Sequence, residues 1–293
     1  MDTLGAQGRF SARCVFKFLS FVLALGAVSL GTQRAFAYPW MIKHGYGGCP
    51  TCHADPSGGE LLTPYGRLQG DLMLRMHYAA DQETPSQAAG FLWGLYQPPA
   101  WLLLGGSYRH MTILEGARPP PPSSPSRPSK PTLSTFPMQA DLYAQARLGA
   151  FRGAASLGLA EVGPDSPHAR AAQITSAPAY RLNLVSRTHW IGWDFGEQYT
   201  LRAGRLNLPF GVRIPEHTAW VRDYTRTDRE SDQQHGIAVA YNGDSARGEI
   251  MLILGNYQVR PDRFRERGYS LYIEGRLADD QRIGVSSLIT RAL

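Results

Sequence analysis

The chain has 293 residues and a formal net charge of +6 at pH 7, which is long enough for one large domain or two smaller ones. Charged residues make up only 18% of it, and glycine, tyrosine and tryptophan are plentiful, a balance that suits a β-rich fold with many turns. The arginines alternate with aromatic and acidic residues instead of clustering, so the composition argues against nucleic acid as a partner.

Residues 1–37 have the pattern of a secretory signal peptide. Three basic residues precede an apolar run from Phe18 to Leu30, and a small-x-small cleavage pattern ends at Ala37. The apolar run is shorter than the ~20 residues that span a bilayer. We therefore expect export from the bacterial cytoplasm and cleavage after Ala37, and not a membrane anchor.

The mature chain then keeps two cysteines, Cys49 and Cys52, separated by two residues and followed directly by His53. This C-x-x-C-H spacing is the attachment motif of c-type haem. In that motif the two thiols add across the two vinyl groups of the porphyrin, and the histidine is aimed at the iron as its proximal axial ligand.

Three other interpretations of the cysteine pair are weaker. A zinc site would need a second ligand pair, and no other cysteine remains in the mature chain. A thioredoxin-like redox pair would need a βαβ context, which the sequence lacks. A disulfide across two residues would be strained. Together with the export signal, the motif predicts one covalent haem c held by Cys49, Cys52 and His53.

The ligand on the distal side of the iron is open at this stage. His44, five residues before Cys49, is the favoured candidate, and His77 is the alternative. Met76 falls on an apolar stripe of helical spacing that begins at Leu61, so we expect it to pack instead of binding the iron. An open sixth position would imply ligand binding and not plain electron transfer.

The residues around the motif resemble a known family. His44-Gly45-Tyr46 precedes it, and residues 58–67 follow it with the sequence GGELLTPYGR. Both resemble the N-terminal monohaem segment of bacterial outer-membrane cytochrome–porin fusions, a family that includes proteins linked to extracellular iron oxidation. The resemblance covers Tyr38 to Arg67 and implies a c-type monohaem domain, which we assign to residues 38–87.

Residues 88–293 carry the alternation that is typical of β-strands. From Ala140 to Leu148 apolar and polar residues alternate without a break, and residues 269–277 do the same. The other candidate strands are residues 102–114, 151–161, 180–193, 199–208, 234–242, 246–256 and 282–291. Several are close to the ~10 residues of a membrane-spanning strand.

The connections between these strands alternate in length. The long ones are residues 115–137, 162–179, 209–233 and 257–267, and the short ones are residues 149–150, 194–198, 243–245 and 278–281. Outer-membrane barrels have long external loops and tight periplasmic turns, whereas a soluble β-sandwich has no reason to gather its long loops at one end. The prediction is a mainly β fold: a small haem-binding segment with a helix, then a porin-like antiparallel outer-membrane β-barrel.

Nine candidate strands are an odd number, and bacterial single-chain barrels use even ones. The last residue, Leu293, is also not the aromatic terminus typical of such barrels. We therefore expect an incomplete barrel, truncated at the C-terminus. Its lipid-facing positions would be Leu142, Ala144, Ala146, Tyr269, Leu271 and Ile273. The lumen-facing Gln145, Tyr272 and Glu274 should tolerate exchange for other polar residues.

These observations together predict a haem-binding electron-transfer protein of the outer membrane. Electrons would pass between periplasmic cytochromes and an external donor or acceptor, with the haem domain on the periplasmic side or inside the barrel. The alternative is a solute porin whose haem is structural or sensory. A peroxidase-like enzyme with an open iron is a third reading, but the chain has no recognisable catalytic triad, phosphate loop or carboxylate pair, so we expect no enzyme.

Overall fold

The computed structural model describes residues 44, 46, 48–75, 91–92, 94–116, 131–161, 171–175, 182–211, 224–227, 232–258, 266–279 and 281–291. The chain divides into two units, residues 1–40 and 41–293, and all the described residues lie in the second. The predicted signal peptide, residues 1–37, lies outside the described residues, as do His77 and Met76.

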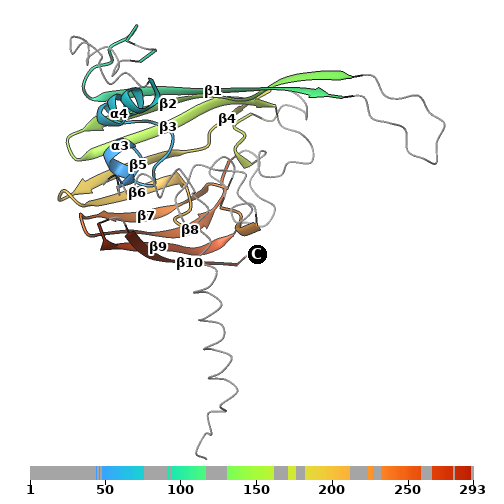
Figure 1. Ribbon diagram of the computed structural model, residues 1–293. Coiled ribbons are helices and arrows are strands. Elements are labelled where there is room, and N and C mark those ends of the chain that lie inside the picture. The colour runs from blue at the N-terminus through green and yellow to red at the C-terminus, as the bar shows by residue number, and fades with distance from the viewer. Residues whose placement is uncertain are drawn as a thin grey trace, which may run out of the picture. The chain divides into compact units, whose positions relative to one another are not determined.

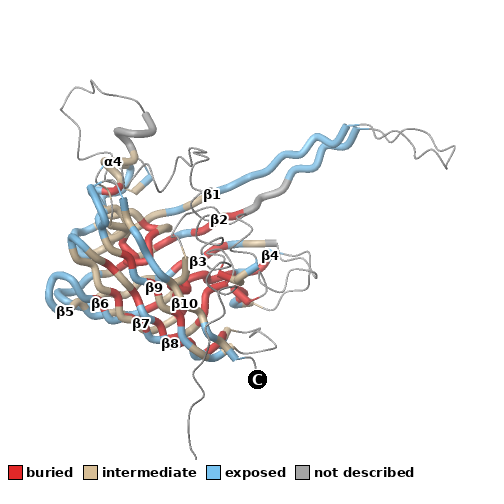
Figure 2. Tube along the Cα trace, turned by 60° about the horizontal axis from the view of Figure 1, so that its bottom comes forward, coloured by how far each residue is buried: buried red, intermediate tan, exposed pale blue. Residues whose placement is uncertain are grey.

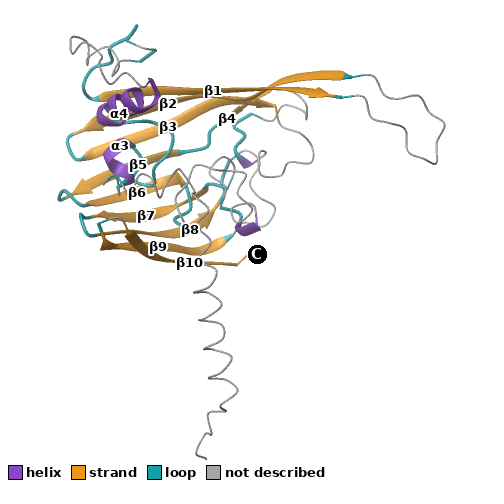
Figure 3. Ribbon diagram, viewed as in Figure 1, coloured by secondary structure: helices purple, strands orange, loops and turns teal. Residues whose placement is uncertain are grey.

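Among the described residues, two helices lie near the start of the unit (Figure 3). Helix α3 spans Cys49–Cys52 and helix α4 spans Pro64–Arg75. The second has a capped start: the Thr63 hydroxyl oxygen accepts a hydrogen bond from the Gly66 N–H at 3.0 Å, and Pro64 occupies the first helical position. Within the described part of the chain, no helix is both long and apolar enough to cross a membrane.

The rest is one antiparallel sheet (Figure 1). Its strands are β1 (Leu102–Glu115), β2 (Thr132–Leu148), β3 (Phe151–Glu161), β4 (Leu182–Val185), β5 (His189–Phe195), β6 (Tyr199–Leu206), β7 (Gln234–Asn242), β8 (Ala246–Gly255), β9 (Arg267–Ala278) and β10 (Gln281–Arg291). Strands pair in chain order, except that β4 and β5 both pair with β3. The mainly β prediction is confirmed, and the connections alternate in length as predicted when β4 and β5 are counted as the one strand expected there.

Strands β4 and β5 correspond to the single strand predicted at 180–193. Strand β5 pairs with the first half of β3, from Phe151 to Ala155, and β4 pairs with the second half, from Gly158 to Glu161. Between them the Ser156 hydroxyl accepts hydrogen bonds from the backbone N–H groups of Arg187 and Thr188, both at 2.9 Å. The Ser156 side chain therefore binds the backbone of the segment between β4 and β5, where the predicted strand is interrupted.

Strand β2 begins earlier than expected, because residues 132–137 were predicted as part of a long loop. They pair with the end of β1, from His110 to Glu115, after a register shift between Arg109 and His110. Proline cannot donate to a strand ladder, so Pro131 and Pro137 weaken the sequence signal for a strand at this position. Among the described strands, no pairing joins β1 to β10, so closure of a barrel stays a prediction.

Buried and exposed residues alternate along the strands (Figure 2), and the two faces that they form differ in polarity. The inner face is defined by its buried side chains, many of them polar or charged, including Asp141, Gln145, Arg202, Glu249, Tyr272 and Glu274. The outer face exposes apolar side chains, including Leu142, Phe151, Leu157, Ile191, Trp193, Ile237, Ile250, Leu252, Ile273, Val285 and Ile289. The alternation predicted for 140–148 and 269–277 is confirmed, and its direction is the reverse of a soluble half-buried sheet, which buries its apolar side.

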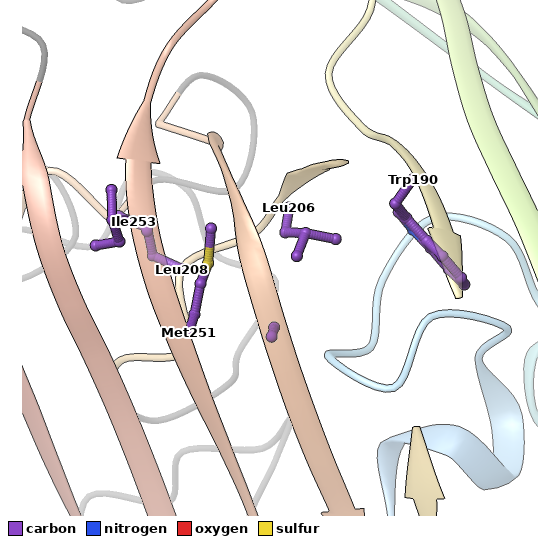
Figure 4. Packing of buried hydrophobic residues seen from close by; sticks show 6 residues of the cluster. Trp190, Leu206, Leu208, Met251 and Ile253 are labelled. Carbon is purple, nitrogen blue, oxygen red and sulfur yellow. The ribbon is translucent and has the colours of Figure 1, made fainter. Parts of the chain in front are cut away.

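A small apolar cluster also lies on the inner face (Figure 4). It contains Trp190, Leu206, Leu208, Ala238, Met251 and Ile253, with Ala154 and Leu288 packed against it. Packed apolar side chains thus cover this part of the inner face. Gln145, Tyr272 and Glu274 are all buried there, so the expectation that they tolerate polar exchange does not fit their surroundings.

Candidate haem site

The C-x-x-C-H motif forms one tight turn. Helix α3 contains both cysteines, and it ends where the His53 N–H donates to the Cys49 carbonyl oxygen at 2.9 Å. Neither Cys49 nor Cys52 is in a disulfide. Burial raises the pKa of the Cys52 thiol, so this thiol is neutral near pH 7. The turn thus presents two thiols and an imidazole side by side, as the sequence predicts.

The ring of His53 is fixed by its backbone surroundings. Its Nδ1 lies 2.9 Å from the carbonyl oxygen of Gly59. A carbonyl oxygen only accepts hydrogen bonds, so Nδ1 is the donor, and in the neutral ring the lone pair sits on Nε2. Metal-binding histidines are commonly oriented in this way, by a backbone carbonyl on the other ring nitrogen.

Glycines bring that carbonyl to the ring. Gly58 and Gly59 have φ values of 79° and 83°, and Glu60 follows with φ 50°. This left-handed run is easily adopted by glycine but costs other residues free energy. A Cβ at Gly58 would also lie 3.1 Å from the Cβ of Cys49, so a larger residue there would push against the C-x-x-C-H turn.

Helix α4 packs against the same turn. The Thr63 N–H donates to the Cys52 carbonyl oxygen at 2.9 Å, and the Thr63 hydroxyl donates to the Thr51 carbonyl oxygen at 3.0 Å. A Cβ at Gly66 would overlap the Cys52 carbonyl group. The residues from Gly58 to Gly66 therefore have physical roles that fix the turn, and residues 48–67 are called the haem segment below.

The haem segment lies on the inner face of the sheet, where polar groups of several strands hold it. The Arg202 guanidinium of β6 donates to the Asp55 carboxylate at 2.6 Å, and the Thr188 hydroxyl donates to the Glu60 carboxylate at 2.7 Å. The Arg67 side chain donates to the carbonyl oxygen of Leu104 in β1. Apolar contacts add to these, since Ala54 and Leu61 pack with Leu103 and Tyr143.

Two inner-face arginines connect this segment to a network of carboxylates. Arg202, whose side chain has no exposed surface, pairs with both Asp55 and Glu249, and its guanidinium carbon lies 5.4 Å from the Trp190 ring centroid. Arg247 pairs with Glu274 of β9, and its Nη1 lies 3.2 Å from the Cys49 sulfur. Buried ions are tolerated when they are paired and hydrogen-bonded in this way.

These residues fit a covalently bound haem. The two thiols and the Nε2 of His53 are the groups that c-type attachment requires. Beside Cys49 the inner face has a hollow, lined by Pro56, Ala240, Asn242, Arg247, Gly248, Glu249 and Tyr272. Cys49, Cys52 and His53 would hold the group, and the sheet would shield one side of it.

The predicted distal ligands are not settled by these contacts. His44 lies in an exposed turn before α3, and its role as the sixth ligand stays a prediction. His77, the alternative, lies outside the described residues. Within the described residues, no group of three or more His, Cys, Asp or Glu side chains is placed to hold a bare metal ion.

The partners of the haem segment were not among the residues predicted for the site. Arg202 and Arg247 were read as part of a general alternation of arginines with aromatic and acidic residues, and Asp55 was not singled out. Their place in the strand alternation could have identified them. Both arginines occupy inner-face positions, where a barrel strand directs side chains into its interior.

No protein-family model, curated protein or solved structure matches the chain. The resemblance to cytochrome–porin fusions therefore depends on the residues from Tyr38 to Arg67.

Proposed function

We propose that this chain is an electron-transfer protein of the bacterial outer membrane that carries one covalent haem c. Cys49 and Cys52 attach the haem, and His53 is its proximal ligand. The observation that carries the proposal is the position of the haem segment: an ion pair and hydrogen bonds hold it on the polar face of a sheet whose other face exposes apolar side chains. When bound, the haem supplies one-electron redox chemistry.

The outer face supports contact with lipid. Exposed apolar side chains occur on strands from β2 to β10, including Leu142, Ile191, Ile250 and Val285. Monomeric soluble proteins rarely expose apolar patches that extend over so many elements. Lipid-facing sides of barrel strands have this composition, so the sheet is the membrane-embedded part of the proposed protein.

Aromatic rings near the short turns support a position of these turns at one edge of the membrane. On the outer face Phe151 lies 5.0 Å from Trp193 between ring centroids, Phe195 lies 5.4 Å from Tyr199, and Tyr199 lies 5.0 Å from Tyr241. Outer-membrane barrels carry such rings where the apolar band meets the lipid headgroups. The short turns at the left of Figure 1 would then project into the periplasm.

The chain's own residues would orient the haem and keep it from water. Thr188 and Arg202 fix Glu60 and Asp55, and the Gly59 carbonyl fixes the His53 ring. Low exposure and fixed charges are the means by which a protein sets the potential of a bound haem.

A solute porin with a structural haem is less well supported. An open channel requires inner-face side chains in contact with water. Gln145, Arg202, Glu249 and Glu274 are buried instead, and the haem segment lies over part of the same face.

Electron transfer across a membrane is the direct test. The full chain, produced with haem attached, is reconstituted in vesicles that contain a trapped reductant. An impermeant oxidant, ferricyanide, is then added outside. We expect oxidant reduction that depends on the protein and is absent from the Cys49→Ala/Cys52→Ala variant. Equal rates for the two proteins would contradict electron transfer, and leakage of small neutral solutes through the wild type would favour the porin.

A further inference from the structure

We propose that the positive charge of Arg247, held beside Cys49 by the sheet, raises the reduction potential of the haem. The inference rests on the proposed function, since it requires that Cys49 is a haem-attachment residue. It extends that function by naming the charge, on a strand far away in the sequence, that favours the reduced form.

The geometry brings the guanidinium to the attachment point. Arg247 Nη1 lies 3.2 Å from the Cys49 sulfur, across 198 residues of sequence. That sulfur is one of the two atoms that would be joined to the porphyrin edge. Arg247 also lines the hollow beside Cys49, together with Glu249 and Tyr272. A haem attached at Cys49 would therefore lie next to this charge.

Contacts on its far side hold Arg247 in this position. Its Nε donates to the Glu274 carboxylate, and its Nη2 lies 3.4 Å from the Tyr272 hydroxyl oxygen. The Tyr272 hydroxyl itself donates to Glu274. The side chain is only 6% exposed, so its charge is weakly screened by solvent.

The neighbouring charges alternate in sign. Glu274 pairs with Arg282 as well as Arg247, and Glu249 pairs with Arg202, which also pairs with Asp55. Three arginines thus face three carboxylates. Distance to the Cys49 sulfur decides which charge matters: the guanidinium of Arg247 lies 3.2 Å from this sulfur.

The direction in which Arg247 shifts the reduction potential follows from electrostatics. Reduction adds one electron and lowers the charge of the bound haem by one, so a nearby positive charge favours the reduced form. Coulomb energies for partly buried charges are large enough to change such an equilibrium about tenfold. Tenfold corresponds to about 59 mV for a one-electron couple.

The test is a spectroelectrochemical titration of the haem-loaded full chain and three variants. Arg247→Gln removes the charge, Arg247→Lys retains it, and Arg282→Gln breaks the other pair of Glu274. We expect Arg247→Gln to lower the equilibrium constant for reduction about tenfold. Arg247→Lys and Arg282→Gln should change it less. Glu249→Gln, which removes a negative charge from the hollow, should shift the potential upward and gives a second readout if Arg247→Gln fails to accumulate.

Haem content is measured first, by the absorbance of the denatured protein in pyridine. Wild type without haem would refute the proposed function itself. Wild type with haem would leave that function standing. In that case, an unchanged potential in Arg247→Gln, or equal shifts in Arg247→Gln and Arg282→Gln, would overturn the role of Arg247. An unchanged or lowered potential in Glu249→Gln would overturn it as well.

Discussion

Replacing Asp55 with asparagine should release the haem segment from the sheet. The Asp55 Oδ1 accepts hydrogen bonds from Arg202 Nη1 at 2.6 Å, from the Ser57 N–H at 2.7 Å and from the Ser57 hydroxyl at 2.5 Å. The substitution keeps the shape of the side chain but removes its charge. Arg202, with no exposed surface, would then depend on Glu249 alone.

The size of the effect follows from this burial. Breaking a buried ion pair by removing one partner costs about 3–5 kcal/mol. Glu249 still neutralises Arg202, so we expect the low end, about 3 kcal/mol. Because ~1.4 kcal/mol corresponds to tenfold in an equilibrium constant, opening of the segment should become more than a hundredfold easier.

Amide hydrogen exchange of the full chain in vesicles measures this opening. The N–H groups of Ala54 and Thr63, which donate to Leu61 and Cys52 carbonyls, should lose protection in Asp55→Asn. Glu266→Gln is the control, because it breaks the more exposed pair with Arg226 at 3.4 Å and should cost less than about 1 kcal/mol. Equal protection in wild type and Asp55→Asn would refute the view that Arg202 and Asp55 anchor the segment.

Three further substitutions test other parts of the account. Leu142→Arg, on the outer face, should destabilise the protein in vesicles by ~2–4 kcal/mol, measured by urea unfolding; no change would argue against lipid contact. Gly66→Ala should lower the haem content of the purified protein, because its Cβ would overlap the Cys52 carbonyl group. Gly70→Ala in the same helix, with open space around it, should not. His44→Ala should alter the ferric absorption spectrum if His44 is the distal ligand; a spectrum changed only by His77→Ala would assign that role to His77.

Much of the sheet could be predicted because strand alternation is a local property. The runs at 151–161 and 234–242 have the bounds of β3 and β7, since the alternation of residue types along each run can be read without knowledge of the rest of the chain. The interruption between β4 and β5 could not be predicted in this way. It depends on the Ser156 hydroxyl, which belongs to a different strand.

The residues of the site also differ in whether a local pattern identifies them. The C-x-x-C-H motif is local, so its two thiols and imidazole were identified from spacing alone. Arg202 and Arg247 act on Asp55 and Cys49 across 147 and 198 residues of sequence. Such pairs depend on how the haem segment lies on the sheet, and no local pattern carries that information.

The proposed function requires that this chain carries a covalent haem within a membrane-embedded β-sheet. Mass spectrometry of the protein from the outer-membrane fraction tests it most directly, because trypsin should release one peptide from His44 to Arg67 that contains both cysteines. The account predicts that this peptide carries the added mass of one haem and that the Cys49→Ala/Cys52→Ala variant lacks it. An unmodified peptide, or recovery of the protein in the soluble periplasmic fraction, would contradict the account.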